Sequence, residues 1–395
     1  MINTKKLSNK IKYTGTACLI IGALLIIFSF LFDAKRAFYN YIIMYTFIVS
    51  IAVGALCLIA IEYMSGAAWS VPFRRVNEFL SSAIPFLIIL VIPIIPGIHT
   101  LYHWSHKDAV DTDPVLQGKS PYLNETFFIL RLFICILLWI IFYIFIIRNS
   151  RKQDYSKDIA LTNKNIKISV LFAPFAVITL TLTSIDLIMS LEAHWYSTIF
   201  GIYYLAGTLL SGISAVTLIS VLLAQKGYFD ERIQRRHFHT FGMLMFALNV
   251  FWAYIAFSQY LLIWYADIPE ETFWLLKRMN GHWQYFSISI IFIHFIIPFI
   301  VLISSAVKTN LNILKFMAIW LLAAHWLDLY WLVMPAFDDH SLAIGWVEAG
   351  FPIFTVGIFI LLFVYKYSKV NIIPVGDPKL KHGIDMFLYP DLSID

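Results

Sequence analysis

Seven ionisable residues lie inside stretches of sequence that are otherwise strongly apolar. They are Glu62, Arg131, Asp186, His294, His325, Asp328 and Glu348. Imidazole titrates near neutral pH, and burial moves the titration of a carboxylic acid towards the same range, so such groups can accept and release protons. The sequence therefore predicts a proton-transfer path inside the apolar part of the molecule. Its candidate residues are Asp186, His294, His325, Asp328, Glu62 and Arg131.

The spacing of these residues supports the prediction at two places. His325 and Asp328 are three positions apart, which puts them on one face of a helix, where they can share a proton or a water molecule. Asp186 shares a polar helix face with Thr179, Thr183 and Ser190. A polar face can equally serve only to hold helices together, and Arg131 can be a structural partner of Asp186 or Asp328. Glu62 lies near the end of its apolar run and can simply reach water.

Histidine pairs raise a second kind of chemistry, the binding of haem or metal. His294 and His325 lie in neighbouring apolar runs and could ligate a b-type haem, although a di-haem anchor needs more histidines at two depths. A group of three, His99, His103 and His106, stands at the end of another run and is more typical of an interfacial polar cluster. The three cysteines form no CxxC or CxxCH motif. We therefore expect neither a metal site nor a covalently bound cofactor.

Ten apolar runs carry these residues. The chain has 395 residues, of which 60% are hydrophobic and 13% are charged, whereas soluble domains contain about 25% charged residues. A helix needs roughly 20 apolar residues to cross a lipid bilayer. Runs of that kind occur at about 16–33, 39–64, 79–98, 123–147, 166–190, 197–224, 238–266, 283–306, 311–335 and 345–367. The predicted fold class is an all-α integral membrane protein with ten transmembrane helices.

The distribution of basic residues predicts the orientation of these helices. If the ten runs alternate in direction, 22 of the 29 Lys and Arg residues fall on the side of the two termini and 6 on the other side. By the positive-inside rule, both termini are then cytoplasmic. The segment 191–196 becomes a tight hairpin on the outer side, with Glu192 and His194 at the water boundary.

Three further segments have predicted architectural roles. Pro85, Pro93 and Pro96 should kink the third span. Residues 267–281 should form a short interfacial helix on the outer side that presents Phe273 and Trp274 to a peripheral partner. The cytoplasmic C-terminal tail, residues 371–395, should dock as an extended strap.

Three sequence segments together resemble a known family. They are 188-IMSLEAHWYSTIFGIYYLAG-207, 259-QYLLIWYADIPEETFWLLKR-278 and 325-HWLDLYWLVMPAF-337. These segments are similar to those of the NrfD/PsrC-like polytopic membrane subunits, and look most like ActF-like subunits of bacterial alternative complex III, a quinol:cytochrome c or quinol:acceptor oxidoreductase.

The resemblance implies a fold and a function. The fold is a single membrane domain, 1–395, with two four-helix bundles, spans two to five (39–190) and six to nine (197–335), flanked by spans one and ten. The function is that of a multi-pass subunit of the bacterial inner membrane that anchors a respiratory complex. It would conduct protons, without a redox centre of its own and without being catalytic alone. Quinol, menaquinol or lipid are the implied ligands. Haem and iron–sulfur centres would belong to partner subunits on the outer face, beside a paralogous membrane subunit and a terminal oxidase.

The same resemblance suggests where quinone could bind. A related subunit holds quinol with a His and an Asp at the outer end of its first bundle, and His99 or His103 could stand at that level here. Glu192 and His194 complete this candidate group. Two alternatives stay open, namely a proton-coupled secondary transporter and a b-haem or quinone-binding anchor of another respiratory complex.

Overall fold

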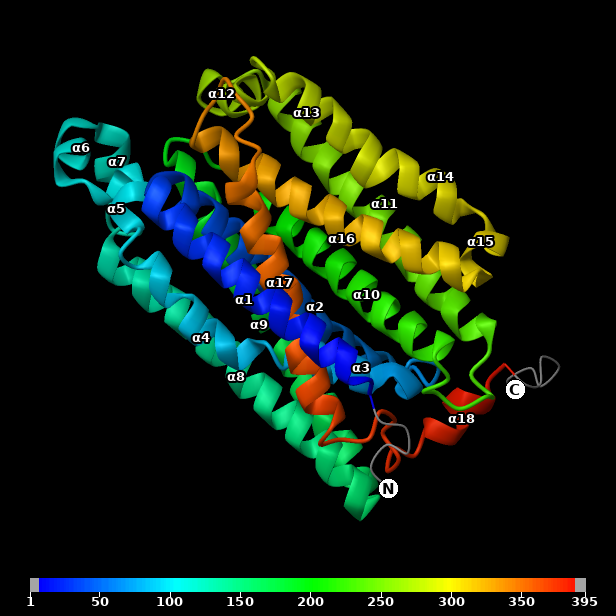
Figure 1. Cartoon of the computed structure of the whole chain (residues 1–395). Helices are drawn as coiled ribbons and strands as arrows, with labels where there is room; N and C mark the ends of the chain where they lie inside the picture. Colours follow the sequence, from blue (N-terminus) through cyan, green and yellow to red (C-terminus); the bar gives the residue numbers. More distant parts are fainter. Residues whose placement is uncertain (1–6, 388–395) are drawn as a thin grey trace.

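The computed structural model describes residues 7–387, and within that range every regular element is a helix. Ten helical segments are long and apolar enough to cross a membrane, which confirms the predicted number (Figure 1). They are α1 (Asn9–Phe32), α2 (Ala34–Ser65), a broken third span (Val71–Ile94), α8 (Glu125–Ser156), α9 (Ile159–Leu187), α10 (Phe200–Gln225), α11 (Arg235–Ala266), a broken eighth span (Trp283–Ile303), a ninth (Leu311–Ala336) that contains α16 (Leu311–Val333), and α17 (Trp346–Tyr367).

Short helices connect these spans. They are α5 (Ile98–Leu101), η4 (His103–Ser105), α6 (Lys107–Thr112), α7 (Pro114–Lys119), η5 (Met189–Glu192), α12 (Pro269–Arg278) and α15 (Ser305–Thr309). In addition, η7 (Met334–Ala336) ends the ninth span and α18 (Leu380–Asp385) follows the last span. Figure 1 shows the start of α1 and α18 at one end of the bundle, which we name the terminal face. The end that carries α6, α7 and α12 is named the loop face. Which face is cytoplasmic stays a prediction.

The helices α8 and α9 continue beyond their apolar runs at the terminal face. α8 extends to Ser156 because Arg and Lys, which follow its apolar part, are good helix formers. Lys157 then adopts a left-handed conformation (φ 51°) that ends the helix. Asp158 begins α9 by accepting a hydrogen bond from the backbone N–H of Ala160.

The third span is not one continuous helix. It is divided into η1 (Val71–Phe73), α3 (Arg74–Ser81), η2 (Ile84–Phe86), α4 (Leu87–Leu90) and η3 (Ile92–Ile94). A proline occupies the first turn of each of the three 3-10 segments, because proline lacks the N–H that an inner helical turn would need. The predicted breaks at Pro85 and Pro93 are confirmed, whereas Pro96 lies in a turn after the span. The span runs from residue 71 to 94 rather than from 79 to 98. Three charged residues, Arg74, Arg75 and Glu78, therefore lie inside it.

The eighth span is interrupted by a π-helix, η6 (Ile291–Ile296), between α13 (Trp283–Ile290) and α14 (Ile297–Ile303). Pro298 follows at the start of α14 and cannot donate the hydrogen bond that an α-helix would bring to the carbonyl of His294. π-Helical turns are rare and occur frequently at functional sites. The interruption sets the position of His294.

α2 is the central helix of the fold. In its apolar part 94% of the residues are buried, against α9, α10, α16 and the third span. Gly54 of α2 faces α10 so closely that an added methyl group would clash with the carbonyl oxygen of Thr208. At the periphery, α1 packs along α17. The division of these helices into the bundles 39–190 and 197–335 stays a prediction.

The segment that follows α17 crosses the terminal face and contains α18, so it is not extended throughout as predicted. The carboxylate of Asp377 lies 2.5 Å from the guanidinium of Arg74, and Lys379 donates to the carbonyl of Gly66. His237 contacts the carbonyl of Gly383 in α18. The last part of the predicted tail, residues 388–395, lies outside the described residues.

Candidate functional site

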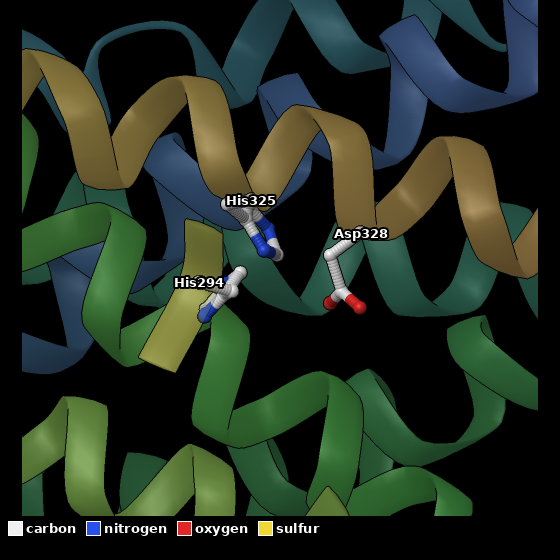
Figure 2. A group of neighbouring side chains, drawn as sticks. All are labelled: His294, His325 and Asp328. Carbon is white, nitrogen blue, oxygen red and sulfur yellow. The ribbon is translucent and has the colours of Figure 1, made fainter. Parts of the chain in front are cut away.

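Three of the predicted proton-transfer residues come together in the middle of the bundle. His294 of η6 approaches His325 and Asp328 of α16, and the nearest ring nitrogens and carboxylate oxygen all lie within 4.8 Å of one another (Figure 2). Each of the three side chains is 1% exposed. We name these three residues the His–Asp cluster.

The hydrogen bonds of the His–Asp cluster are incomplete. Asp328 accepts a hydrogen bond from the hydroxyl of Tyr203 on α10. Among the described residues, none of the four ring nitrogens of His294 and His325 has a hydrogen-bond partner. Buried polar atoms are nearly always paired with protein or with ordered water. Water molecules that bridge the two imidazoles would satisfy these atoms and connect them to Asp328.

Aromatic and backbone contacts hold the two imidazoles in place. The indole of Trp252 stacks on His294 with the ring centroids 3.6 Å apart. Phe47 of α2 lies beside His325 at 5.8 Å between centroids. Gly207 of α10 approaches the other side, where an added methyl group would lie 2.7 Å from Cε1 of His325. The rings are therefore wedged between α2, α10 and α11.

A row of polar atoms on α11 continues from the cluster. Asn249, Trp252 and Gln259 fall on one helical face and are buried. Within the described part of the chain, Asn249 Oδ1, Trp252 Nε1 and Gln259 Oε1 each lack a hydrogen-bond partner. Since α11 ends at the loop face, Gln259 lies about 10 Å beyond Trp252 towards that face, whereas Asn249 lies on the opposite side of Trp252.

The remaining predicted proton-transfer residues are held elsewhere in ion pairs. Arg131 of α8 binds both carboxylate oxygens of Asp186 at 2.9 Å, and Tyr122 donates to the same carboxylate at 3.1 Å. Of its two expected partners, Arg131 thus has Asp186 and not Asp328. Ser190, from the same polar face, donates its hydroxyl to the carbonyl of Asp186. Asp186 is fully paired and does not belong to the His–Asp cluster.

Glu62 does not reach water, contrary to one of its expected roles. It is 5% exposed and pairs with Arg74, which also binds Asp377 and the hydroxyl of Tyr63. Beside this group, Arg75 pairs with Glu78 and Asp154. Glu348, the seventh ionisable residue, pairs with Arg36 at 2.6 Å and joins α17 to α2. These ion pairs connect segments that are far apart in the sequence.

The candidate quinone-contacting residues His99, Glu192 and His194 each have a different polar partner. His99 contacts Ser105 and lies 3.3 Å from Glu125. His103 is exposed on η4. Glu192 pairs with Lys277 at 2.7 Å. His194 pairs at 2.5 Å with the half-buried Asp113.

The His194–Asp113 pair has an electrostatic consequence at the loop face. The hydrogen bond from His194 lowers the pKa of Asp113 below its usual value, with backbone N–H groups of α7 adding to the effect. Because the side chains of His194 and Asp113 are 47% and 25% exposed, the pair is screened by water and salt.

A b-type haem does not fit between the two histidines of the cluster. The carboxylate of Asp328 lies within 4.8 Å of both imidazoles, in the space that a porphyrin between them would fill. Trp252 covers one face of His294. The three side chains also form a donor set of the kind that can hold a metal ion, and Tyr203 engages one oxygen of Asp328.

The interfacial helix α12 is present, but one of its predicted features is wrong. Trp274 is 3% exposed and is not presented to a partner. Its indole stacks on Trp195 at 4.3 Å between centroids, and Trp331 lies edge-on at 5.4 Å. The guanidinium of Arg278 lies 3.5 Å above Trp274. α12 is thus locked onto the hairpin and onto α16.

Sequence reasoning missed Tyr203, Trp252 and Arg278. All three are of types that are common near membrane interfaces, and nothing in their spacing distinguishes them. No protein-family model matches the chain, and no curated protein matches it in sequence. The three segments that carry the family resemblance nevertheless meet in space, through the Trp195–Trp274–Trp331 stack and through Tyr203 and Asp328.

Proposed function

We propose that this protein is an integral membrane subunit of a respiratory quinol:electron-acceptor oxidoreductase, in which it anchors the complex and forms part of a proton-transfer path. The observation that carries the proton role is the His–Asp cluster, whose buried ring nitrogens lack partners within the described chain. Ionisable groups inside a membrane domain are costly and usually mark ion or proton routes. The respiratory role is supported by the three motif segments.

The geometry of the cluster suggests how protons would move. Asp328 has one carboxylate oxygen engaged by Tyr203. The other oxygen and the imidazoles of His325 and His294 would exchange protons through bridging water molecules, since no hydrogen bond joins these groups directly in the described structure. The stacked Trp252 keeps His294 in register with the two residues of α16. Gln259 then offers a hydrogen-bonding atom towards the loop face.

In this proposal electrons travel through partner subunits. Iron–sulfur and c-haem subunits would sit on the loop face, which is the outer face if the positive-inside rule holds. A paralogous membrane subunit would oxidise quinol, and a terminal oxidase could accept the electrons. Both termini would then be on the cytoplasmic side of the bacterial inner membrane.

Two substitutions in the purified complex test the proton role. Asp328→Asn and His325→Gln keep the approximate size of each side chain but remove its proton exchange. We expect each to lower proton uptake by reconstituted complex at least about tenfold, since positioned proton-transfer groups commonly contribute 10²–10⁴-fold. The matched control is Asp339→Asn, an exposed aspartate on the loop face. Wild-type proton uptake in both cluster variants would refute the proposal.

A second candidate is a proton-coupled secondary transporter. It is favoured by the broken third and eighth spans, which occupy equivalent positions if the chain consists of two five-span halves. Interrupted helices in matching positions are typical of such transporters. Affinity purification separates the two candidates. Co-purification with haem-bearing and iron–sulfur proteins supports the respiratory subunit, whereas a chain that purifies alone and conducts protons with a solute supports the transporter.

A further inference from the structure

A long apolar groove lies between α16 and α17, with side chains of α10 at its base. Figure 1 shows the helices α16 and α17 diverging from the loop face towards the terminal face. The groove between them has a volume of about 770 Å³. Sites that hold small ligands commonly measure roughly 300–1,000 Å³. We name this feature the α16–α17 groove.

The α16–α17 groove extends over about half of the membrane-spanning length of the protein. On α10 and the residue that follows it, the lining runs from Ala215 to Lys226, and on α17 it runs from Pro352 to Phe363. Eleven residues of α-helix correspond to about 17 Å. One leaflet of a bilayer contributes about 15 Å of hydrocarbon, half of the full thickness. The groove therefore matches the depth of a single leaflet.

The inner end of the groove lies beside the His–Asp cluster. Phe47 of α2 and Trp326 of α16 line this end, and their rings contact each other at 5.0 Å between centroids. The ring of Phe47 also lies 5.8 Å from that of His325. The groove thus begins at the terminal face and ends in the middle of the bundle.

Polar side chains are unevenly distributed along the groove. Among the described lining residues, Lys226 is the only charged one, and it lies with Tyr228 at the terminal-face end. Deeper in the groove, the polar side chains are those of Thr355 and Trp326, and the hydroxyl of Thr355 already donates to the carbonyl of Phe351. The other lining side chains are apolar. This distribution favours hydrocarbon inside the groove and a polar group at its open end.

Positive charge is concentrated at that open end. Ile11, in the first turn of α1, lines the groove near Lys226 and is flanked in sequence by Lys10 and Lys12. Basic residues at the surface of a membrane attract anionic lipid headgroups. The charge of the open end is therefore complementary to an anionic headgroup.

We propose that the α16–α17 groove is a binding site for one anionic phospholipid of the terminal-face leaflet. Its headgroup lies at Lys226, and its acyl chains follow α10 to Phe47 and Trp326. A chain that fills the groove contacts side chains of several helices at once, which holds it more firmly than a lipid at a flat protein surface. The bound lipid also supports Phe47 on the side opposite His325.

Native mass spectrometry of the full-length protein, purified with any subunits it binds, tests the site. The protein is delipidated in detergent and incubated with phosphatidylglycerol, and the lipid molecules retained by each particle are counted. Ala323 and Ala17 are both exposed alanines within membrane spans, but only Ala323 lines the groove. We expect Ala323→Trp, which fills the groove with an indole, to retain one phosphatidylglycerol fewer than the wild type. The matched control, Ala17→Trp, should retain the wild-type number.

A change of charge tests the position of the headgroup. A basic residue near an anionic membrane surface contributes an attraction equivalent to about a fivefold change in affinity. In Lys226→Gln we therefore expect the preference for phosphatidylglycerol over phosphatidylcholine to fall about fivefold. Lys164→Gln, a change of an exposed lysine near the terminal-face end of α9, should leave this preference unchanged. An unchanged preference in Lys226→Gln would overturn the placement of the headgroup.

Equal phosphatidylglycerol counts for Ala323→Trp and the wild type would overturn the inference. If Ala323→Trp does not fold, Val356→Trp replaces it, because Val356 lines the groove from α17 and is 50% exposed. Two other occupants would also overturn the inference. One is a quinone that is bound to the protein as purified and is lost in Ala323→Trp. The other is the transmembrane helix of a partner subunit, which would dissociate from the same variant.

Discussion

Asp186 and Asp328 are two buried aspartates in the same membrane domain with opposite surroundings. Both are 1% exposed, and both accept a hydrogen bond from a tyrosine hydroxyl, of Tyr122 and Tyr203 respectively. Asp186 also binds the guanidinium of Arg131 through both oxygens. Asp328 instead faces two imidazoles whose ring nitrogens lack partners in the described structure.

The difference separates a structural ion pair from a proton-exchanging site. A carboxylate held by a bidentate arginine has little reason to take up a proton, because doing so leaves the guanidinium without its counter-charge. A carboxylate that faces imidazoles and no fixed cation can change its protonation state at lower cost. Asp186 therefore serves to join α8 to α9, and Asp328 is the residue on which the proposed function depends.

The largest expected effect comes from breaking the structural pair. Arg131→Met leaves the Asp186 carboxylate buried and unpaired, so we expect a loss of about 3–5 kcal/mol of stability. The measurement is the thermal unfolding of the purified protein in detergent. Adding Asp186→Asn to this variant removes the stranded charge and should recover most of the loss. An Arg131→Met protein as stable as wild type would contradict the structural role of the pair.

A smaller effect is expected when the site of His325 is tightened. Gly207→Ala places a methyl group 2.7 Å from Cε1 of His325, and such overpacking typically costs about 1–3 kcal/mol. We expect slower proton uptake as well, because the imidazole must move away from its neighbours. The matched control is Gly118→Ala, where an added methyl group meets nothing within 4 Å. Equal stability and uptake in the two variants would show that His325 has room to move.

The two tyrosines allow the aspartates to be compared directly. Tyr122→Phe and Tyr203→Phe each remove one hydroxyl that donates to a buried aspartate, at a typical cost of about 1 kcal/mol. We expect Tyr122→Phe to leave quinol oxidation and proton uptake unchanged, because Arg131 still holds Asp186. Tyr203→Phe should slow proton uptake several-fold. Equal rates in the two variants would remove the functional distinction between Asp186 and Asp328.

The smallest expected effect concerns the exposed pair at the loop face. The pKa of Asp113 is lowered by His194, so its contribution to stability is present above the unfolded-state pKa of about 3.9 and is lost as the pH falls through the folded-state value. Asp113→Asn should therefore change the melting temperature slightly near neutral pH and not at all in strong acid, below both pKa values. If the change in melting temperature does not depend on pH, the hydrogen bond between His194 and Asp113, rather than the charge of Asp113, contributes the stability.

Several features of this fold follow from sequence because they depend on local patterns. Hydropathy alone predicts ten spans, and helical spacing places His325 beside Asp328. Proline positions predict that the third span is broken. The prolines of the C-terminal segment also predict the strap over the terminal face, whereas its contact through Asp377 is visible only in the structure.

Other features depend on contacts between distant segments, which local patterns do not encode. Arg131 has two possible aspartate partners in the sequence, and the choice of Asp186 is fixed by the packing of α8 on α9. The predicted interfacial helix was expected to expose Trp274, but Trp195 of the hairpin stacks on its indole. Arg278 lacks a carboxylate at salt-bridge distance, whereas the other buried arginines of the described chain each have one. This difference depends on the packing of distant segments and is visible only in the structure.

The packing of α1 on α17 has a consequence for biosynthesis. The first of the ten spans makes its main contact with the last one, through close approaches such as Gly22 to Phe354 and Gly357 to Leu19. Of the ten spans, α1 has the smallest buried share, 22%. During synthesis of the intervening spans, α1 lies in the lipid without α17. A chain whose synthesis stops before α17 would therefore leave α1 exposed to membrane proteases and chaperones that act on incompletely folded proteins.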